Sequence, residues 1–158
     1  MAGKFKEKAT IVYQSRIAAD IYSMWLQTER IAAQAVPGQF VSLYCNDASR
    51  LLPRPISICE INPRSGMLRL VYRVAGKGTE EFASMHPGDT LDILGPLGNG
   101  FPLDRAEGKR SMLIGGGIGL PPMVELCRQL PGEKTVVAGF RSERFLMEDF
   151  EALAARTA

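Results

Sequence analysis

Short apolar stretches, separated by turn residues, fill the first hundred positions of the chain. Apolar and polar residues alternate within these stretches, and an alternation of period two is typical of half-buried β-strands. The pattern predicts strands at 8–16, 21–28, 39–45, 55–61, 67–74 and 90–94. Six strands at this spacing, with turns between them, predict a small antiparallel barrel or sandwich.

One segment, GKGTEEFASM at 76–85, interrupts the strand pattern. It begins with two glycines, and Thr79 then stands as a candidate helix N-cap before Glu80 and Glu81. Threonine favours N-caps and acidic residues favour first turns, so the segment predicts a glycine loop that opens a short helix. Because the backbone N–H groups at a helix N-terminus attract anions, this loop is a candidate anion site.

The pattern changes after GPLGNGFPL at 95–103. A charged linker follows, and then come a short apolar run, a four-glycine loop, an amphipathic helix at about 121–130, a buried strand at 135–140 and a helix at 144–155. This order is typical of an α/β nucleotide-binding domain with a parallel sheet.

The predicted fold class is therefore β followed by α/β. Residues 1–103 are expected to form a six-stranded antiparallel barrel, and residues 109–158 are expected to form the N-terminal part of a parallel α/β domain. Two strands and two helices are about half of such a domain, because a sheet of two parallel strands cannot have both faces covered.

The composition describes a globular chain of 158 residues, with 46% hydrophobic residues and a net charge of +2. These values give no reason to expect nucleic acid or acidic lipid as a partner.

No signal core and no run of ~18 apolar residues is present, so a cytoplasmic protein without membrane contact is expected. Cys45, Cys59 and Cys127 fit no metal-binding spacing and are expected to be reduced, and His86 is expected in a surface loop. No catalytic residue is predicted.

A Pro-Arg-Pro sequence opens the fourth predicted strand, in LLPRPISICEI at 51–61. The flanking prolines stiffen the chain and hold Arg54 in an extended conformation. The alternation that follows turns Ser57 away from the face that carries Ile56 and Ile58. The cation and the hydroxyl are then separated by about 10 Å of extended chain, a spacing that suits a ligand with an anionic part and an uncharged polar part.

Several motifs, in order, resemble flavoprotein reductases of the ferredoxin reductase type and, within them, the electron-transfer subunits of class B dihydroorotate dehydrogenases. These motifs are PGQF at 37–40, RPISI at 54–58, VYRVAGKGT at 71–79, PGD at 87–89, GPLGNGF at 95–101, GGGIGLPP at 115–122 and GFRS at 139–142. The resemblance extends from about residue 5 to 155. It implies an FAD-binding antiparallel barrel followed by an NAD-binding α/β domain.

The resemblance implies FAD contacts in two strand segments and one loop. By position, Arg54 would contact the pyrophosphate and Ser57 would lie near the N5 edge of the flavin. The full implied set is Arg54, Pro55, Ile56, Ser57, Val71, Tyr72, Arg73, Gly78 and Thr79. Most relatives in the wider superfamily place an aromatic residue between such an arginine and serine. Here Pro55 and Ile56 stand there, which favours the dehydrogenase subunit and leaves Tyr72 or another group to cover the ring.

The resemblance also assigns NAD(H) to the glycine loop. Its implied contacts are Gly115, Gly116, Gly117 and Gly119. The loop does not fit GxGxxG, because Leu120 occupies the position of the third glycine. It fits the reductase pattern better, in which this loop passes the nicotinamide cofactor at the carboxyl edge of the sheet.

The implied function is that of an FAD-containing electron-transfer subunit in pyrimidine biosynthesis. It would pass reducing equivalents between NAD and an FMN-containing dihydroorotate dehydrogenase catalytic subunit, on which dihydroorotate is oxidised, within a heterotetramer. Relatives carry four closely spaced cysteines for a two-iron, two-sulfur cluster after the NAD domain. This sequence lacks them, so a C-terminally shortened chain without a bound cluster or other metal is expected, and NADH is expected to reduce its flavin weakly or not at all.

Two other functions stay open from the sequence. A related reductase subunit with another partner, for example one that oxidises ferredoxin or a sulfur compound, would keep the barrel and the glycine loop. A non-catalytic flavin- or nucleotide-binding fragment is the third function, and the incomplete α/β domain supports it. A flavin absorbance band in the purified protein would separate this fragment from the first two.

Overall fold

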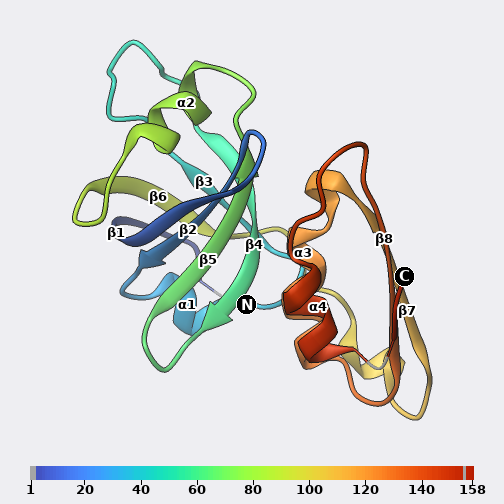
Figure 1. Cartoon of the computed structure of the whole chain (residues 1–158). Coiled ribbons are helices and arrows are strands. Elements are labelled where there is room, and N and C mark those ends of the chain that lie inside the picture. The colour runs from blue at the N-terminus through green and yellow to red at the C-terminus, as the bar shows by residue number, and fades with distance from the viewer. Residues whose placement is uncertain (1–2, 155) are drawn as a thin grey trace.

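The computed structural model describes residues 3–154 and 156–158. Figure 1 shows a β-barrel beside a smaller parallel sheet, with helices α3 and α4 between them. The barrel is closed and antiparallel, with strand order β1-β2-β5-β4-β3-β6, and the sheet has the order β7-β8-β9. The predicted fold class is confirmed.

All six predicted barrel strands are present. Their bounds are β1 (Phe5–Ala18), β2 (Ile21–Gln27), β3 (Phe40–Leu43), β4 (Arg54–Asn62), β5 (Met67–Arg73) and β6 (Thr90–Leu97). Alternate side chains fill the interior, and Met24, Leu26, Leu68 and Leu70 have no exposed surface. The short helix α1 (Ile31–Gln34) was not predicted; its first residue is buried in the same core.

The predicted short helix after the glycine loop is α2 (Lys77–Ser84). The predicted N-cap was wrong, because Gly76 occupies that position and Thr79 lies inside the helix. The Thr79 hydroxyl accepts a hydrogen bond from the Ala75 N–H and donates one to the Gly76 carbonyl, each at 2.9 Å. Thr79 therefore holds the glycine loop closed instead of capping the helix. Only Glu80 of the two glutamates lies in the first turn.

The second unit contains one strand more than expected. Its elements are η1 (Leu103–Ala106), β7 (Ser111–Gly116), η2 (Gly117–Gly119), α3 (Pro121–Gln129), β8 (Lys134–Gly139), α4 (Met147–Leu153) and β9 (Arg156–Thr157). The third strand, β9, pairs in parallel with β8. Strand β9 has only two residues, too few to show an alternation of apolar and polar positions, so the sequence pattern did not predict it. The predicted helix at 144–155 begins later, since Leu146 is left-handed (φ 62°), and position 155 lies outside the described residues.

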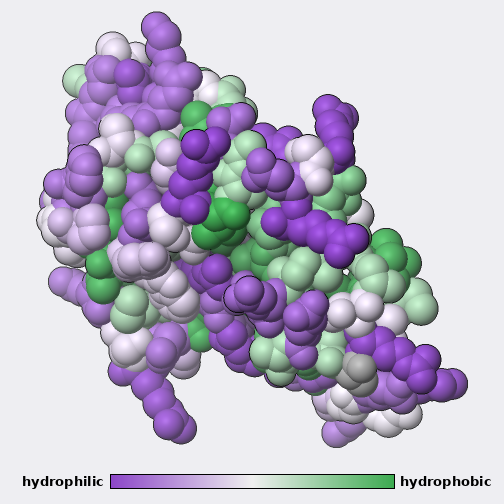
Figure 2. All heavy atoms as spheres, in the orientation of Figure 1, coloured by the Kyte–Doolittle hydropathy of each residue, from purple (hydrophilic) through white to green (hydrophobic). Residues whose placement is uncertain are grey.

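A second apolar core joins the two units. It combines outward-facing barrel residues, among them Cys59 and Val71, with Val124 of α3 and Phe150 of α4. Strand β4 is therefore buried on both faces over Ile58–Ile61. Figure 2 shows mostly polar groups on the face it presents, with apolar groups over the centre and the parallel sheet. Over residues 3–154 and 156–158, no helix has the length and apolar character needed to cross a membrane.

Candidate functional site

The two strand segments implied by the resemblance lie on the neighbouring strands β4 and β5, at the end of the barrel where these two strands are not paired; this unpaired end is called the opening below. Strand β4 pairs with β5 only from Ile58 onward, where Ile58 lies opposite Leu70. Before that point, β4 pairs only with β3, so residues 54–57 and 71–73 form no ladder with each other. The facing strand edges leave backbone groups without ladder partners, and such groups bind ligands readily.

Arg54 and Gly78 meet at one end of this opening. A Cβ built on Gly78 would lie 2.5 Å from the Arg54 Nε and 2.8 Å from its Cζ, so the guanidinium packs directly on the helix backbone. The first N–H groups of α2 have no partner within the helix, and the helix N-terminus carries a partial positive charge. In the part of the chain that the structure describes, Arg54 forms no ion pair. Two cationic features thus converge, and neither is neutralised by an ion pair of Arg54 among the described residues.

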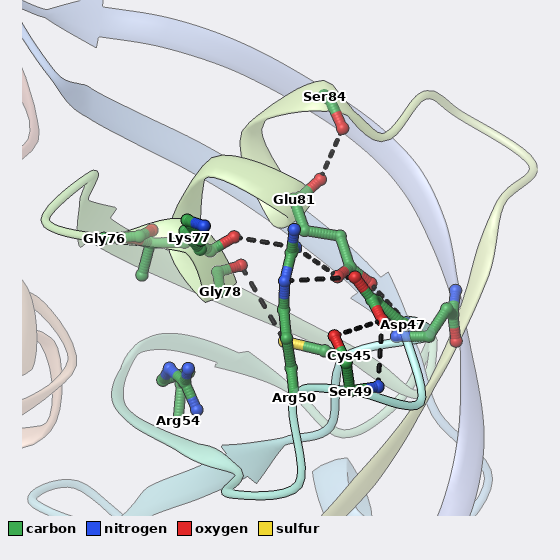
Figure 3. A network of polar contacts seen from close by, with 12 residues as sticks. Cys45, Asp47, Ser49, Arg50, Arg54, Gly76, Lys77, Gly78, Glu81 and Ser84 are labelled. Atoms are coloured by element: carbon green, nitrogen blue, oxygen red, sulfur yellow. Dashed lines mark hydrogen bonds and ion pairs between the residues drawn. The ribbon is translucent and has the colours of Figure 1, made fainter.

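The loop between β3 and β4, residues 44–53, is fastened to α2 (Figure 3). Arg50 donates hydrogen bonds to the Lys77 carbonyl at 2.8 Å and to the Glu81 carboxylate at 2.6 Å. The other oxygen of Glu81 accepts the Asn46 N–H at 2.5 Å. Within the loop, a hydrogen bond from the Ser49 hydroxyl lowers the pKa of Asp47. The sequence did not predict this network, since its members are far apart along the chain.

The ring of Tyr72 lies in the barrel core, with 1% of its surface exposed. It stacks on Tyr22 at 6.0 Å between ring centroids and contacts Phe82 of α2 edge-on. Its hydroxyl donates to Gln14, whose amide in turn donates to the carbonyls of Phe82 and Met85 at 2.9 Å each. Burial raises the pKa of Tyr72. Tyr72 can therefore line the opening through its backbone, while its side chain holds α2 in place.

The glycine loop lies beside the same opening. A Cβ on Gly117 would lie 3.8 Å from the Arg73 Nη2, and the φ of Gly117 is +52°, a left-handed conformation that favours glycine. Because the loop leads directly into α3, the position of that helix determines the position of the loop. The residues implied for FAD and those implied for NAD are thus brought together at one side of the molecule.

An ionic network fixes α3 to the barrel. The Glu125 carboxylate, on a residue with 2% exposure, accepts a hydrogen bond from the Ile61 N–H at 2.9 Å. Arg128 bridges Glu125 and Glu60. Arg69 joins Glu60 at 2.6 Å to Asp149 of α4 at 2.7 Å. The network has five charged side chains, which are scattered through the sequence, and no motif marked them.

The remaining titratable candidates show no catalytic arrangement. Cys45, Cys59 and Cys127 are free thiols, and burial raises the pKa of each. His86 lies in a surface turn with 83% of its side chain exposed, as predicted. No three His, Cys, Asp or Glu residues gather as a candidate metal site within 3–154 and 156–158.

A family model described as the oxidoreductase FAD-binding domain matches residues 8–101, which include all six barrel strands except the first residues of β1. The chain belongs to this family. The matched region contains both sides of the barrel opening and the whole of α2. The predicted resemblance to flavoprotein reductases is thereby confirmed at the level of the family.

Curated relatives extend the similarity into the α/β unit. The chain is 44% identical over 154 residues to the dihydroorotate dehydrogenase B (NAD⁺) electron transfer subunit of Bacillus caldolyticus, covering 93% of this chain and 60% of that protein. It is 45% identical over 154 residues to the same subunit of Enterococcus faecalis, covering 94% and 59%. The chain thus spans about 60% of the length of these relatives.

A solved structure shows the same architecture. An NADH-dependent reduced ferredoxin-NADP oxidoreductase matches with a TM-score of 0.84 and 28% identity, over 94% of this chain and 55% of that one. The predicted resemblance to dihydroorotate dehydrogenase electron-transfer subunits and the ferredoxin reductase-like fold are both confirmed by these similarities.

The residues at the opening fit FAD, the cofactor named by the family. The pocket that Gly78 leaves for the Arg54 guanidinium would be filled by any Cβ, so the cation and the helix N-terminus can approach one pyrophosphate together. Ser57 lies further along β4, opposite Phe40 of β3. Ser57 thus belongs to the part of β4 that does not pair with β5.

Proposed function

We propose that this chain binds FAD across the barrel opening and acts as an electron-transfer subunit. One observation carries the proposal: the convergence of Arg54, Gly78 and the α2 N-terminus at one end of the split between β4 and β5. An arginine that forms no ion pair within the described residues, together with helix N–H groups, matches the two negative charges of a pyrophosphate.

The proposed FAD site consists of both edges of the opening together with the glycine loop before α2. Arg54 and the Gly78 backbone hold the pyrophosphate, and Thr79 keeps that loop closed. The remaining members are Pro55, Ile56, Ser57, Val71, Tyr72 and Arg73. Ile56 and the Ser57 hydroxyl border the ring, and Tyr72 contributes its backbone. When bound, FAD supplies the exchange between two-electron hydride transfer and single-electron transfer.

We further propose that residues 1–103 are the flavin-binding domain and residues 109–158 the start of the nucleotide-binding domain. Gly115, Gly116, Gly117 and Gly119 are the proposed NAD(H) contacts, since the loop lies beside Arg73 at the same opening. The ionic network through Glu125 keeps this loop at a fixed distance from the barrel.

The proposed partner is a dihydroorotate-oxidising catalytic subunit, which carries FMN and assembles with this subunit in a heterotetramer. The similarity to electron-transfer subunits of dihydroorotate dehydrogenase B supports this partner. This chain would pass reducing equivalents between that subunit and NAD, and a cytoplasmic location stays a prediction.

Flavin binding by the purified chain tests the proposal. The protein is stripped of flavin and titrated with FAD, and the quenching of flavin fluorescence and the shift of its absorbance band are followed. We expect saturable binding of one FAD per chain. A chain that stays folded by circular dichroism and shows no saturable change would contradict the proposal. Titration of the FAD-loaded chain with NAD⁺ then tests the glycine loop separately.

A further inference from the structure

Two adjacent leucines, Leu51 and Leu52, are exposed to solvent beside the proposed phosphate site. Leu51 is 82% exposed and Leu52 is 75% exposed. Within residues 3–154 and 156–158, they are the most exposed of the large apolar side chains. Leucine is usually withdrawn from water, so an exposed pair at a ligand site indicates a surface that becomes covered.

The leucines do not lie on a free loop tip. Their loop, residues 44–53, is held to α2 by the Arg50 hydrogen bonds to Lys77 and Glu81 and by the Asn46 N–H bond to Glu81 (Figure 3). These contacts anchor the loop just before the leucines, and strand β4 begins just after them. The apolar pair is thus presented at a fixed place.

Arg54 connects the leucines to the phosphate site. Its guanidinium donates a hydrogen bond to the Leu52 carbonyl and packs against Gly78 at the same time. Leu52 precedes Arg54 by two positions, which is about 7 Å of extended chain. Ser57 lies on the other side of Arg54 along the strand. If the pyrophosphate binds at Arg54 and the flavin lies towards Ser57, as proposed above, the adenosine half of FAD would extend in the opposite direction along the chain, towards the leucines.

We propose that Leu51 and Leu52 form the adenine contact of the bound cofactor and make the site selective for FAD over FMN. This inference rests on the proposed function. A purine has flat apolar faces, and apolar side chains bind such faces by stacking on them. FMN has the flavin and a phosphate but no adenosine, so it reaches Arg54 and leaves the leucines uncovered.

The test compares two flavins on one protein. The flavin-free 158-residue chain and its Leu51→Ser/Leu52→Ser double variant are titrated with FAD and with FMN, and the flavin fluorescence is recorded. We expect the double variant to bind FAD about tenfold more weakly, because the apolar contact is lost, and to bind FMN within about twofold of the unaltered chain. The single variants Leu51→Ala and Leu52→Ala repeat the measurement with a smaller change in the loop.

Control variants separate a specific contact from a general effect. Met112 and Ile114 on β7 are 66% and 67% exposed, so Met112→Ser/Ile114→Ser removes a similar exposed apolar pair away from the loop. This control is expected to leave both affinities unchanged.

An equal loss of FAD and FMN affinity in the leucine variants would overturn the inference, because it would show damage to the phosphate site. Unchanged FAD affinity would also overturn it and assign the leucines to a protein partner. If neither flavin bound the unaltered chain, the proposed function itself would fail.

Discussion

The guanidinium of Arg54, at the start of β4, lies on the backbone of Gly78 in the first turn of α2. A Cβ at Gly78 would come within 2.5 Å of the Arg54 Nε. The helix N-terminus and the arginine can therefore share a ligand only if position 78 carries no side chain. The contact brings together the two segments that the sequence marked separately as candidate anion sites.

Replacing Gly78 with alanine is expected to weaken FAD binding without unfolding the chain. The added methyl displaces the far end of a flexible side chain, so the fold is kept while the cation moves away from the helix. We expect a loss of about tenfold in FAD affinity, close to the strength of one hydrogen bond to a charged group. Fluorescence titration measures it. Gly139→Ala is the control, because Gly139 lies outside the proposed sites and its Cβ would make only an ordinary contact, 3.8 Å from the Gly115 carbonyl oxygen; equal effects of the two variants would contradict the role of the Arg54 contact.

Removal of the arginine itself is expected to have a larger effect. Arg54→Ala should weaken FAD binding by about 1.5–3 kcal/mol, since a charge-assisted hydrogen bond is lost. Arg54→Lys should recover only part of this, because lysine keeps the charge but not the planar set of donors. The measurement is the amount of FAD that each variant retains after dialysis. Arg64→Ala is the matched control, because Arg64 is an exposed arginine outside the proposed site. Wild-type flavin retention by Arg54→Ala would count against the assigned pyrophosphate contact.

The Glu125 carboxylate is expected to be essential to the junction between the barrel and α3. Glu125→Ala leaves the Ile61 N–H without its acceptor at a largely buried position and removes one of the two carboxylates that Arg128 binds. We expect the free energy of unfolding to fall by about 3 kcal/mol. Urea denaturation measures the change. The exposed Glu151→Ala should alter stability by less than about 0.5 kcal/mol, and a similarly small effect of Glu125→Ala would show that the network does not stabilise the junction.

The stability of the protein is expected to decrease at high pH, partly through Cys59. Burial between β4 and the second unit raises the pKa of this thiol, so it stays neutral in the folded chain while the unfolded chain ionises above about pH 8.5. The buried thiol makes its full contribution to the free energy of unfolding below that pH, and this contribution decreases as the pH rises. The free energy of unfolding should therefore fall by up to about 1.4 kcal/mol per pH unit for this group.

Urea denaturation of Cys59→Ala across the alkaline range tests this pH dependence. The variant loses packing at every pH, so the slope, and not the absolute stability, is the informative quantity. We expect a shallower decrease than in the unaltered chain, with the remaining slope owed partly to Tyr72, whose pKa is raised by the same cause. If the free energy of unfolding fell equally steeply with pH in both proteins, Cys59 would not be a buried thiol that stays neutral in the folded chain.

Much of the fold could be predicted because strand periodicity is a local signal. All six barrel strands and the order of elements in the α/β unit followed from alternation and turn residues. The exceptions are short elements, α1 and β9, whose few residues carry no periodic pattern and are stabilised by neighbours. The N-cap at Gly76 was also missed, because Thr79 uses its hydroxyl within the loop.

The sequence by itself determined which segments carry the chemistry: a stiff Pro-Arg-Pro strand entry, a glycine loop before a short helix and a second glycine loop before a longer one. Their composition and local backbone preferences suffice for that. Only the tertiary structure decided how these segments meet. Strand β4 leaves β5 before Ile58, Arg54 packs on Gly78, and Glu125 binds the Ile61 backbone. These relations depend on contacts between residues distant in sequence, which closure of the barrel and burial against α3 create and no local pattern encodes.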